Sequence, residues 1–568
     1  MIVGIDLGTT NSLVACHKDG ETVVIPNRLG RLLTPSVVSV DENRQILIGE
    51  TAREYGYMHP DSTARVFKRT MGTDHKYVLN GMEFSSEELS SFVLRSLKED
   101  AEVYLGEEVD EAIISVPAYF NDNQRKATHK AGELAGLKVS RIISEPTASS
   151  IAYGVGADDR NERCLVLDLG GGTFDVSALE YFHNIIEVHA IAGDNMLGGE
   201  DFTMELMKLF CAKVGIPFVF ADTMVLNALY KMCEKAKCEI SEKKQVELSL
   251  NVNGIILEET ITLEEYEEAC GELLDRFGKP IEKCLRDGKY VLDDIDRVIL
   301  VGGATRLSIV RDHVRKILNI WPQFYVDPDT SVAVGAALQA AMKQRDKTVE
   351  EVILTDVCPF TLGTEVVDDS GWIEVRGIYL PIIERNTTIP VSKTVPVYNV
   401  YENQKAVHVK VLQGESRMTS GNLLLGSIDV DIPPGPKGSQ QVDITYTYDI
   451  NSLLEVVVKV VSTGEVKKAI IQNEHKDFDM KEAEERFEKL SYLKQNPRED
   501  EENLFAILRG NRLYEECTGK DREQVKEALT SFDGMLAKGS RIEIERARRK
   551  LLDLFDEIEN KDEVSFYS

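Results

Sequence analysis

The sequence lacks any stretch apolar enough to span a bilayer. It also leaves no room for a secretory signal peptide, because a predicted strand begins at Ile2. Nine cysteines are scattered along the chain, and the pair Cys233 and Cys238 has no second pair or histidine cluster to complete a zinc site. These absences predict a cytoplasmic protein whose thiols are reduced and mostly buried.

Positive charge is also scarce. The chain has 66 lysines and arginines against 96 aspartates and glutamates, which gives a net charge of −30 at pH 7. Such a surface repels nucleic acid and anionic membranes, so neither is expected as a partner, and its simplest effect is solubility. With 568 residues and an apolar fraction of 43%, the chain is long enough for three or four packed domains.

Two short segments rich in glycine and threonine, each beginning with an aspartate, dominate the sequence. The first spans Asp6–Ser12 and the second spans Asp168–Asp175. Each follows a run typical of a buried strand, Ile2–Ile5 before the first and Cys164–Leu167 before the second. One local pattern therefore occurs twice, far apart in the chain.

A hairpin pattern follows each segment. The chain turns at Asp19 and Gly20 after the first segment and near Asn184 after the second. One such segment alone is equally well explained as a tight turn, but a repeated unit of strand, loop and hairpin favours a duplicated fold. We therefore predict an α/β nucleotide-binding fold whose two lobes close on one phosphate chain.

The residue types in the two segments suit a phosphate chain. Glycines let the backbone approach phosphate oxygens and point N–H groups at them, and threonine hydroxyls add donors. Asp6 and Asp168 cannot bind phosphate directly, because like charges repel. They can hold a hydrated Mg²⁺ that bridges the phosphates, since magnesium keeps several waters and needs few protein ligands.

Two charged residues near these segments are candidates for the hydrolytic chemistry. Glu145 stands before Pro146, where a rigid carboxylate can orient a water or bind the waters around magnesium. Lys68 can neutralise a γ-phosphate. Each has a simpler interpretation, Glu145 as a surface or capping acid and Lys68 as a solvated lysine.

A later glycine pair is a candidate for the base of the nucleotide. Gly302 and Gly303 follow a predicted strand and let the backbone lie against an adenine, with Arg306 stacked on its face. Glu234 and Lys237 share one face of a predicted helix, so they can reach ribose hydroxyls or form a plain surface pair.

The sequence pattern changes three times along the chain. Residues 1–346 alternate helices and strands, and 347–357 read as an interdomain linker, with an edge strand of the next domain as the alternative. Residues 358–475 have the short strands of a β-sandwich, and 476–568 have the helical periodicity of a small bundle. The elements expected there include a hairpin turn at Asp449–Ser452 and helices at Met480–Leu493, Gln524–Leu536 and Ile542–Ile558.

Taken in order, these pieces resemble the actin-like ATPase superfamily. Gly4–Ser12, Leu165–Ser177 and Val298–Val314 are similar to the motifs of the seventy-kilodalton heat-shock, or DnaK-like, chaperones. Glu384–Pro390 and Leu412–Glu415 are similar to that family's peptide-binding domain, and the resemblance runs from residue 2 to at least 472. It implies a duplicated actin-like ATPase domain with two ribonuclease-H-like lobes, a β-sandwich peptide-binding domain and an α-helical lid.

The resemblance also implies a function. Such a protein is an ATP hydrolase and molecular chaperone of the stress response, which binds and releases extended apolar segments of unfolded proteins under the control of ATP. The implied cofactors are ATP and ADP with Mg²⁺, with K⁺ as an optional addition. The implied partners are unfolded polypeptides and a J-domain cochaperone, and the protein is expected to act as a monomer.

Matching motifs assign roles to residues of this sequence. The implied hydrolytic set is Asp6, Thr9, Lys68, Glu145, Asp168, Thr173 and Asp175, with Asp6 and Asp168 holding magnesium through water. The implied nucleotide contacts are Gly8, Thr9, Thr10, Asn11, Gly170, Gly171, Gly172, Thr173, Gly198, Gly199, Glu200, Glu234, Lys237, Ser241, Gly302, Gly303, Arg306 and Asp329. The implied relay between domains is Arg141, Pro146 and Asp356, and the implied peptide cleft is Leu362, Thr364, Val367, Val397, Val400 and Val407.

Several details are similar to the HscC branch of the family. The lid is short, Val246–Thr262 lacks part of the hairpin usual in DnaK, and the linker Val352–Asp356 lacks a common third leucine. The shortened hairpin leaves open whether an exchange factor of the DnaK type is needed. Ser144 stands where asparagine is usual, which alters the expected coupling to a J domain.

The predicted peptide cleft also departs from the DnaK pattern. Val367 and Val400 stand in place of the methionine and alanine that arch over the peptide, and Thr364 and Val397 in place of an isoleucine and a phenylalanine. We expect a cleft that accepts extended apolar peptides but prefers different ones. The two rival readings, a sugar kinase of the same superfamily and an actin-like filament, do not account for the chain after residue 357.

Overall fold

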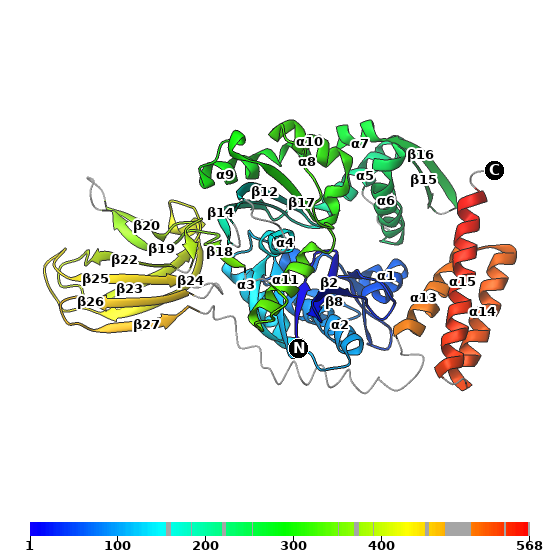
Figure 1. Cartoon of the computed structure of the whole chain (residues 1–568), viewed down its shortest axis with the longest axis horizontal. Helices are drawn as coiled ribbons and strands as arrows, with labels where there is room; N and C mark the ends of the chain where they lie inside the picture. The colour runs from blue at the N-terminus through cyan, green and yellow to red at the C-terminus, as the bar shows by residue number, and fades with distance from the viewer. Residues whose placement is uncertain are drawn as a thin grey trace.

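The computed structural model describes residues 1–154, 161–182, 185–218, 223–252, 254–349, 352–368, 374–389, 391–448, 454–471, 501–538 and 541–565. A central body with two large sheets lies between an all-β part on one side and three C-terminal helices on the other (Figure 1). The turns expected near Asn184 and at Asp449–Ser452, and the helix expected at Met480–Leu493, lie outside the described residues. Within them, no helix is long and apolar enough to cross a membrane.

The first large sheet has the strand order β11-β10-β1-β2-β3, with β4 paired to β2. β1, β10 and β11 are parallel, whereas β2 and β3 return antiparallel. The predicted turn at Asp19 and Gly20 is confirmed, and both residues have the positive φ, 55° and 85°, that a tight hairpin turn favours. The strands are β1 (Ile2–Asp6), β2 (Asn11–Lys18), β3 (Glu21–Ile25), β4 (Thr34–Pro35), β10 (Glu111–Val116) and β11 (Lys138–Ser144).

The second large sheet repeats this arrangement. β12 pairs parallel with β17 and antiparallel with β13, and β13 pairs antiparallel with β14. The predicted repeat of strand, loop and hairpin is therefore present in the strand pairing. The strands are β12 (Asn161–Leu169), β13 (Phe174–Phe182), β14 (Ile185–Asp194) and β17 (Arg297–Val301).

Helices cover both sheets, and small residues let them approach closely. A Cβ on Gly4 would clash with the backbone of Ala337, and one on Gly335 would clash with the backbone of Ala148, so α11 fits tightly against β1 and α4. The helices are α1 (Gly49–Met58), α2 (Ser86–Leu105), α3 (Asp122–Leu134), α4 (Glu145–Gly154), α5 (Gly199–Val214), α6 (Thr223–Lys243), α7 (Leu263–Ala269), α8 (Gly271–Asp275), α9 (Gly278–Gly288), α10 (Ser308–Leu318) and α11 (Ser331–Lys343).

Shorter elements complete the central body. β15 and β16 form an antiparallel hairpin beside α6, whose tip exposes Ile255 and Ile256. The short strands are β5 (Val38–Val40), β6 (Ile46–Ile48), β7 (Thr63–Ala64), β8 (Tyr77–Leu79), β9 (Met82–Phe84), β15 (Gln245–Val252) and β16 (Ile255–Thr262). The 3₁₀ turns are η1 (Pro60–Ser62), η2 (Phe67–Thr70), η3 (Leu292–Asp294) and η4 (Gly303–Arg306), and η5 (Thr419–Gly421) follows in the all-β part.

One strand belongs to both the central body and the all-β part. β18 (Ile353–Val357) pairs parallel with β14 and antiparallel with β21 (Thr388–Ile389). The segment that we interpreted as a linker, with an edge strand as the alternative, is thus a strand from Ile353 onward with partners in both parts.

The all-β part consists of two four-stranded antiparallel sheets, β20-β19-β23-β24 and β22-β25-β26-β27. Val411 and Val430 of the first sheet share a buried core with Tyr446 and Val456 of the second. The strands are β19 (Leu362–Asp368), β20 (Val375–Ile383), β22 (Val391–Tyr398), β23 (Ala406–Gln413), β24 (Leu423–Asp431), β25 (Gln441–Tyr448), β26 (Leu454–Val460) and β27 (Val466–Ile470).

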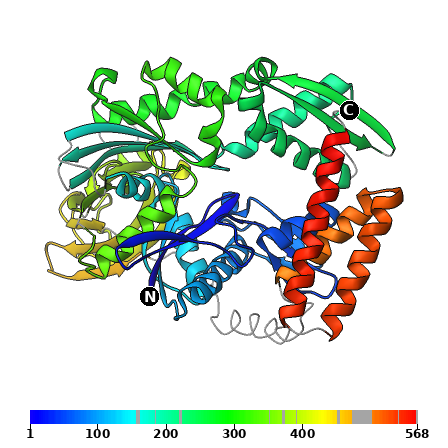
Figure 2. The ribbon, with the colours of Figure 1, turned by 45° about the vertical axis from the view of Figure 1, so that its right-hand side comes forward.

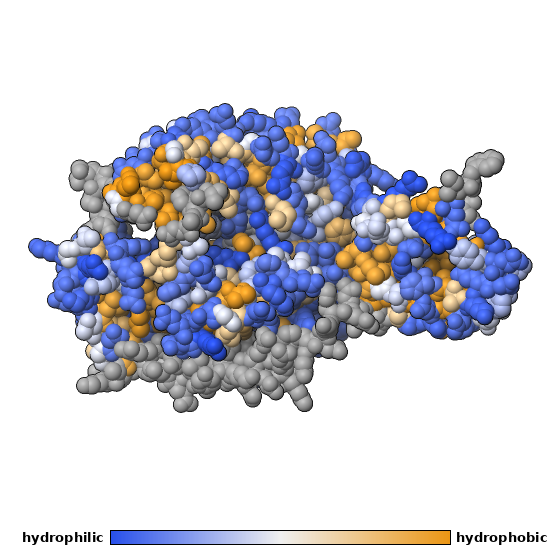
Figure 3. All heavy atoms as spheres, turned by 180° about the vertical axis from the view of Figure 1, so that it is seen from behind, coloured by the Kyte–Doolittle hydropathy of each residue, from blue (hydrophilic) through white to orange (hydrophobic). Residues whose placement is uncertain are grey.

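The three C-terminal helices, α13 (Glu501–Glu516), α14 (Gly519–Lys538) and α15 (Arg541–Ser565), share a core of their own around Phe532 and Phe555. They contain the helices predicted at Gln524–Leu536 and Ile542–Ile558. We call these three helices the C-terminal bundle. Figures 1 and 2 both place it against the central body, at the end away from the all-β part. The view from behind shows a largely hydrophilic surface interrupted by apolar patches, in keeping with the net charge (Figure 3).

Candidate functional site

A cavity of about 340 Å³ lies where the two large sheets face each other. Most of the residues that sequence reasoning assigned to the nucleotide line it. They are Asp6, Gly8, Thr9, Thr10, Asn11, Lys68, Glu145, Asp168, Gly170, Gly171, Thr173, Gly199, Glu234, Lys237, Ser241, Gly302, Gly303, Arg306 and Asp329.

The first loop of the cavity is the turn between β1 and β2. Gly8 N donates to Ser12 Oγ at 3.2 Å, and Ser36 Oγ donates to Gly8 O at 2.7 Å. A Cβ on Gly8 would clash with Asn11 O, so the turn can close only around a glycine.

The second loop lies directly opposite the first. A Cβ on Gly171 would clash with the side chain of Thr10, and one on Gly172 would lie 2.7 Å from Thr9 Cγ2. The two glycine loops therefore bring backbone N–H groups and threonine hydroxyls together around one space. Such an arrangement of donors is suited to an anion such as a phosphate chain.

Four carboxylates and one lysine occupy the inner end of the cavity. Lys68 Nζ and Glu145 Oε1 form a buried ion pair at 2.6 Å. Asp6 Oδ1 accepts a hydrogen bond from Ser115 Oγ at 2.7 Å. Sequence reasoning left open whether Lys68 and Glu145 are solvated surface groups, and their burial excludes that interpretation.

Burial and mutual repulsion hold these carboxyls toward the protonated form. Burial, followed by the charge of Glu145, raises the pKa of Asp6 to about 7 against the opposing effect of Lys68. The same two causes raise the pKa of Asp175 to about 8. Burial, then Glu145, Asp175 and Asp6, raise the pKa of Asp168 well above its usual range. The cluster therefore has too much negative charge for its surroundings.

A hydrated magnesium ion fits this excess of negative charge. The Oδ2 atoms of Asp168 and Asp175 are buried, and neither has a hydrogen-bond partner among the described residues. Among those residues, no three histidine, cysteine or acidic side chains converge closely enough to bind a metal directly. Asp6 and Asp168 thus suit an ion that is held through its waters.

The opposite end of the cavity is formed by η4 and α6. Gly302 has a φ of 82°, and a Cβ there would clash with Leu169 O. Lys237 Nζ is held by Glu234 Oε2 at 2.7 Å and by Gly199 O at 3.0 Å. Glu234 and Lys237 are therefore paired within the cavity wall rather than on an open surface.

Arg306 lies at the rim of this end. Its guanidinium donates to Asp329 Oδ2 at 2.7 and 3.0 Å and to Asp327 Oδ2 at 3.3 Å. It also lies 6.0 Å from the centre of the Phe324 ring. Acidic partners thus fix the arginine at the place where an adenine is expected.

Four predicted site residues do not line the cavity. Asp175 lies beneath it and accepts from Tyr119 N at 3.2 Å. Gly172 and Gly198 pack against each other, since a Cβ on Gly198 would lie 2.5 Å from Gly172 N. The fourth, Glu200, points away from the cavity and accepts from Tyr230 Oη at 2.9 Å. These residues support the loops from behind.

Sequence reasoning missed other members of the site. Arg69 Nε donates to Gly172 O at 3.1 Å, and its Nη2 binds Asp201 Oδ2 at 2.5 Å, so it braces the second loop. Its position beside Lys68 in η2 was the available signal. Cys238 lines the cavity as well, and its place one turn after Glu234 on α6 predicts the same face.

Two of the predicted relay residues, Arg141 and Asp356, interact electrostatically. Burial raises the pKa of Asp356 in β18, and Arg125 and then Arg141 oppose that rise. Burial lowers the pKa of Arg141, and Asp356 opposes that fall. Pro146 O, in α4, accepts hydrogen bonds from Ser149 and Ser150. Arg125 was not predicted, and it is positioned by the carbonyl oxygens of residues 118 and 120.

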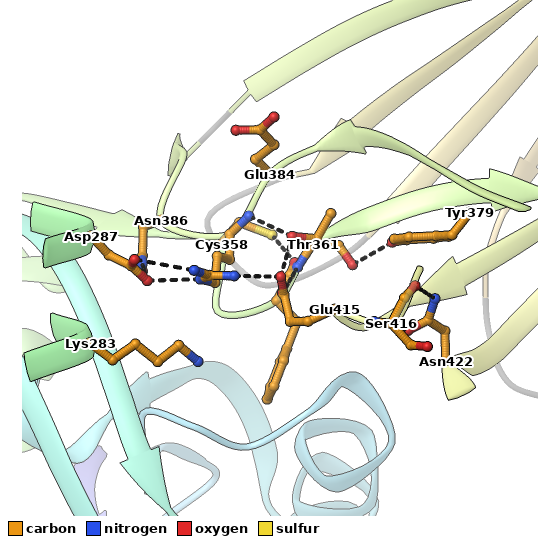
Figure 4. A network of polar contacts seen from close by, with 12 residues as sticks. Lys283, Asp287, Cys358, Thr361, Tyr379, Glu384, Asn386, Glu415, Ser416 and Asn422 are labelled. Atoms are coloured by element: carbon orange, nitrogen blue, oxygen red, sulfur yellow. Dashed lines mark hydrogen bonds and ion pairs between the residues drawn. The ribbon is translucent and has the colours of Figure 1, made fainter. Parts of the chain in front are cut away.

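A polar network joins the all-β part to the central body (Figure 4). Arg385 donates to both carboxylate oxygens of Asp287, at 2.8 and 3.1 Å, and to Glu415 Oε2 at 2.6 Å. Asn386 Oδ1 accepts from Ile191 N at 3.1 Å, and Asn386 Nδ2 donates to Asp287 Oδ2 at 3.2 Å. Arg385 and Asn386, which follow β20, thus connect the all-β part to β14 and α9 of the central body.

The predicted peptide residues lie in the all-β part, on β19, β22 and β23 and in the segment between β22 and β23. Leu362 and Thr364 of β19 are buried, with exposures of 0% and 1%. The other four are partly exposed: Val367 on β19, Val397 on β22, Val407 on β23 and Val400 between β22 and β23. Leu362 belongs to the shared core, as a pocket floor requires.

Comparisons with known proteins agree on one group of relatives. A model of the Hsp70 protein family matches residues 2–80 and 76–565 of this chain. The chain is 40% identical over 539 residues to the chaperone protein DnaK of Thermosipho melanesiensis, which covers 92% of this chain and 85% of that one. It is 41% identical over 490 residues to the chaperone proteins DnaK of Thermotoga petrophila and Thermotoga maritima, which covers 84% of this chain and 81% of each relative.

Proposed function

The chain belongs to the Hsp70 protein family, and from that membership we propose how its parts work together. It is an ATP-dependent molecular chaperone: it hydrolyses ATP and binds unfolded proteins. We propose that residues 1–346 form the ATPase domain, 347–357 the linker, 358–475 the peptide-binding domain and 476–568 the lid.

In the ATPase domain, the two glycine loops grip the phosphates of ATP. Thr9, Thr10 and Thr173 supply hydroxyl donors beside the backbone N–H groups. Glu234, Lys237 and Ser241, with Gly302, Gly303 and Arg306, frame the adenosine. The lining of the cavity supports this orientation, with the carboxylates around Lys68 at one end and Gly302, Gly303 and Arg306 at the other.

Hydrolysis depends on placement and charge rather than on covalent chemistry. Lys68, fixed by Glu145, supplies positive charge where negative charge develops on the phosphoryl group. Glu145, which lines the cavity, orients the attacking water, and the buried Asp175 supports it from beneath the cavity. Asp6 and Asp168 hold magnesium through water, and the ion when bound neutralises the phosphates.

The linker strand carries the signal between the domains. β18 is paired with β14 of the ATPase domain and with β21 of the β-sandwich, and this double pairing is the observation that carries the proposal. ATP favours the state with β18 docked, and hydrolysis releases it. By reciprocity, a bound peptide must then bias the ATPase domain.

The peptide-binding domain holds an extended client by hydrogen bonds to strand edges, with one aliphatic side chain in a pocket. Val367, Val397, Val400 and Val407 are partly exposed on one part of the β-sandwich, which supports a cleft there. Leu362 and Val407 supply an apolar floor. Because Thr364, Val367, Val397 and Val400 differ in size from the groups usual in DnaK, the preferred peptides differ from those of DnaK.

Several finer assignments belong to the same proposal. We place the chain in the HscC-like branch, as a monomer of the cytoplasm with Mg²⁺ and optionally K⁺. A J-domain cochaperone contacts the surface around Arg141, and Ser144 modifies that coupling. The exchange factor, if one acts, contacts the lobe that carries β15 and β16.

The proposal is tested by binding of a fluorescent apolar peptide to the full-length protein. With ADP the peptide binds tightly, and with ATP its affinity falls by about 5–150-fold, the range of a coupling of about 1–3 kcal/mol. Equal affinity with both nucleotides would refute the clamp.

A further inference from the structure

A buried arginine of the C-terminal bundle reaches the central body beside the nucleotide cavity. The Arg512 side chain is 6% exposed, and its Nε donates to Glu54 Oε2 of α1 at 2.8 Å. Its Nη1 donates to Glu516 Oε2 at 2.9 Å and its Nη2 to Glu559 Oε1 at 2.7 Å. One guanidinium thus ties α13 and α15 to each other and to α1.

An apolar contact surrounds this charge network. Leu504 and Leu508 of α13 pack on a small cluster of the central body formed by Val37, Leu47, Ala52 and Tyr55. A buried charge that loses its partner is left unpaired at a high cost in free energy. The network therefore specifies where on α1 the bundle lies.

α1 in turn holds α6, the helix that forms one wall of the cavity. Asn227 Nδ2 donates to Gly56 O at 2.8 Å, and Lys231 Nζ lies 4.5 Å from the centre of the Tyr57 ring. Lys231 stands one turn before the residues of α6 that line the cavity. Those residues are Glu234, Lys237, Cys238 and Ser241.

The charges of the bundle also reach α6. The pKa of Lys231 is lowered, first by burial and then by Arg512, while Glu516, Glu54 and Glu559 oppose the fall. In Figures 1 and 2, the C-terminal end of α15 lies beside the β15–β16 hairpin, which is on the same lobe as α6. The bundle thus contacts α1 and lies beside the lobe that carries α6, the helix that lines the cavity.

We propose that Arg512 is a positioning residue of the nucleotide site, which acts by holding α1 and α6 together. A nucleotide leaves when α6, which lines the cavity, moves away from α1, and that movement breaks the contacts of Lys231 and Asn227 with α1. Arg512 fixes the bundle on α1 through Glu54, so a docked bundle opposes that opening. This inference rests on the proposed function, in which ATP favours docking of β18, and extends that docking to the bundle.

The test is the rate at which a fluorescent ATP analogue leaves the full-length protein, measured by stopped flow after mixing with excess unlabelled ATP. Arg512→Met is expected to speed release at least about 5-fold, while release of the ADP analogue stays unchanged because the bundle is then undocked. Arg512→Lys keeps the charge and is expected to restore part of the slow release.

Arg509→Gln is the matched control. Arg509 pairs with Asp556 at 2.6 Å and Glu559 at 2.5 Å, and among the described residues both partners belong to the bundle. This variant loses two ion pairs of the bundle without touching α1, so ATP release is expected to stay slow. Glu54→Gln removes the negative charge that Arg512 meets on α1 and leaves the bundle sequence intact. It therefore keeps the test valid if Arg512→Met unfolds the bundle.

Two results would overturn the inference: ATP release unchanged in both Arg512→Met and Glu54→Gln, or equal acceleration by Arg509→Gln. A wild-type protein that holds neither nucleotide contradicts the proposed function itself. The two failures are therefore distinguishable.

Discussion

At the scale of single residues, the site depends on four carboxylates beside one lysine, and three of the four, Glu145, Asp168 and Asp175, are buried. Lys68 pairs with Glu145, which leaves Asp6, Asp168 and Asp175 without a cation among the described residues. Their raised pKa values express that imbalance. A cation with its waters would relieve this excess of negative charge.

The first prediction concerns pH. Asp6 and Asp175 have pKa values of about 7 and about 8 in the folded protein, against 3.8 for an ordinary aspartate. The folded state therefore binds more protons than the unfolded chain over this range, and the free energy of unfolding falls as pH rises through it. The slope is at most about 1.4 kcal/mol per pH unit for each carboxyl. Thermal unfolding in EDTA between pH 5 and pH 9 measures it.

Two comparisons sharpen that experiment. Mg²⁺ with ADP is expected to flatten the slope, because the ion binds the deprotonated carboxylates. Asp175→Asn is expected to remove part of it. A nucleotide-free protein that becomes more stable as pH rises from 5 to 8 would contradict the assigned charge imbalance.

The second prediction concerns Lys68. Lys68→Met is expected to lower kcat for ATP hydrolysis by about 10²–10³-fold, because a preorganised positive charge near the developing negative charge is lost. ATP binding, supported by the two loops, is expected to persist, and equilibrium binding of a labelled nucleotide checks it. Lys18→Met, which removes an exposed lysine paired only loosely with Glu107 at 3.3 Å, should leave kcat unchanged. Full turnover in Lys68→Met would exclude the catalytic role.

Much of this site can be predicted from sequence, because its loops are local. Gly8 and Asn11, or Gly170 and Thr173, are close in the chain, so their spacing alone indicates a turn that cradles an anion. The layer behind the cavity is different. Arg69 reaches Asp201 across 132 residues, and no local pattern records such a contact.

At the scale of secondary structure elements, β18 is the strand that connects the central body to the all-β part. Its first residues continue the sheet of β14 and its last residues pair with β21. The sequence indicated a linker or an edge strand, and composition alone cannot separate these readings. A short apolar run adopts a strand when another sheet edge offers it hydrogen bonds.

The third prediction tests this strand. Asp356 is partly buried and is attracted by Arg125 and Arg141, so Asp356→Asn removes its electrostatic attraction to both arginines. Basal ATP hydrolysis is expected to stay within about twofold, while its stimulation by an apolar peptide disappears, since the coupling of about 1–3 kcal/mol is lost. Steady-state phosphate release with and without peptide measures both.

Asp346→Asn is the control for this change. Asp346 is partly exposed, and among the described residues its carboxylate accepts local hydrogen bonds from Thr348, at 2.9 and 2.7 Å. Stimulation is expected to survive in this variant. Normal stimulation in Asp356→Asn would remove β18 from the relay.

At the scale of the whole molecule, the structure has the all-β part and the C-terminal bundle on opposite ends of the central body (Figure 1). The contacts that set this arrangement lie far apart in sequence. Arg385 and Asp287 are 98 residues apart, and Arg512 and Glu54 are 458 apart. Domain content can be predicted from periodicity, but docking cannot, because it depends on pairs of side chains that only the folded chain brings together.

The fourth prediction concerns this docking. Arg385→Met removes the guanidinium that bridges Asp287 and Glu415. ATP is then expected to produce a smaller decrease in radius of gyration than in the wild type, because the undocked state becomes more populated. Small-angle scattering with ATP and with ADP measures the change. Arg376→Met is the control, because it removes a largely exposed arginine that pairs with Glu374 within the all-β part. This variant should show the same ATP-induced decrease in radius of gyration as the wild type. Equal compaction in Arg385→Met would show that the network does not hold the parts together.

The central claim is that one strand joins the nucleotide site to the peptide site. Hydrogen exchange of the backbone amides in β18 tests it most directly, because its pairing with β14 protects them only while the strand is docked. We predict slow exchange of residues 353–355, the part of β18 paired with β14, with ATP, and fast exchange with ADP or after peptide is added. Equal protection of these amides under all three conditions would contradict the account.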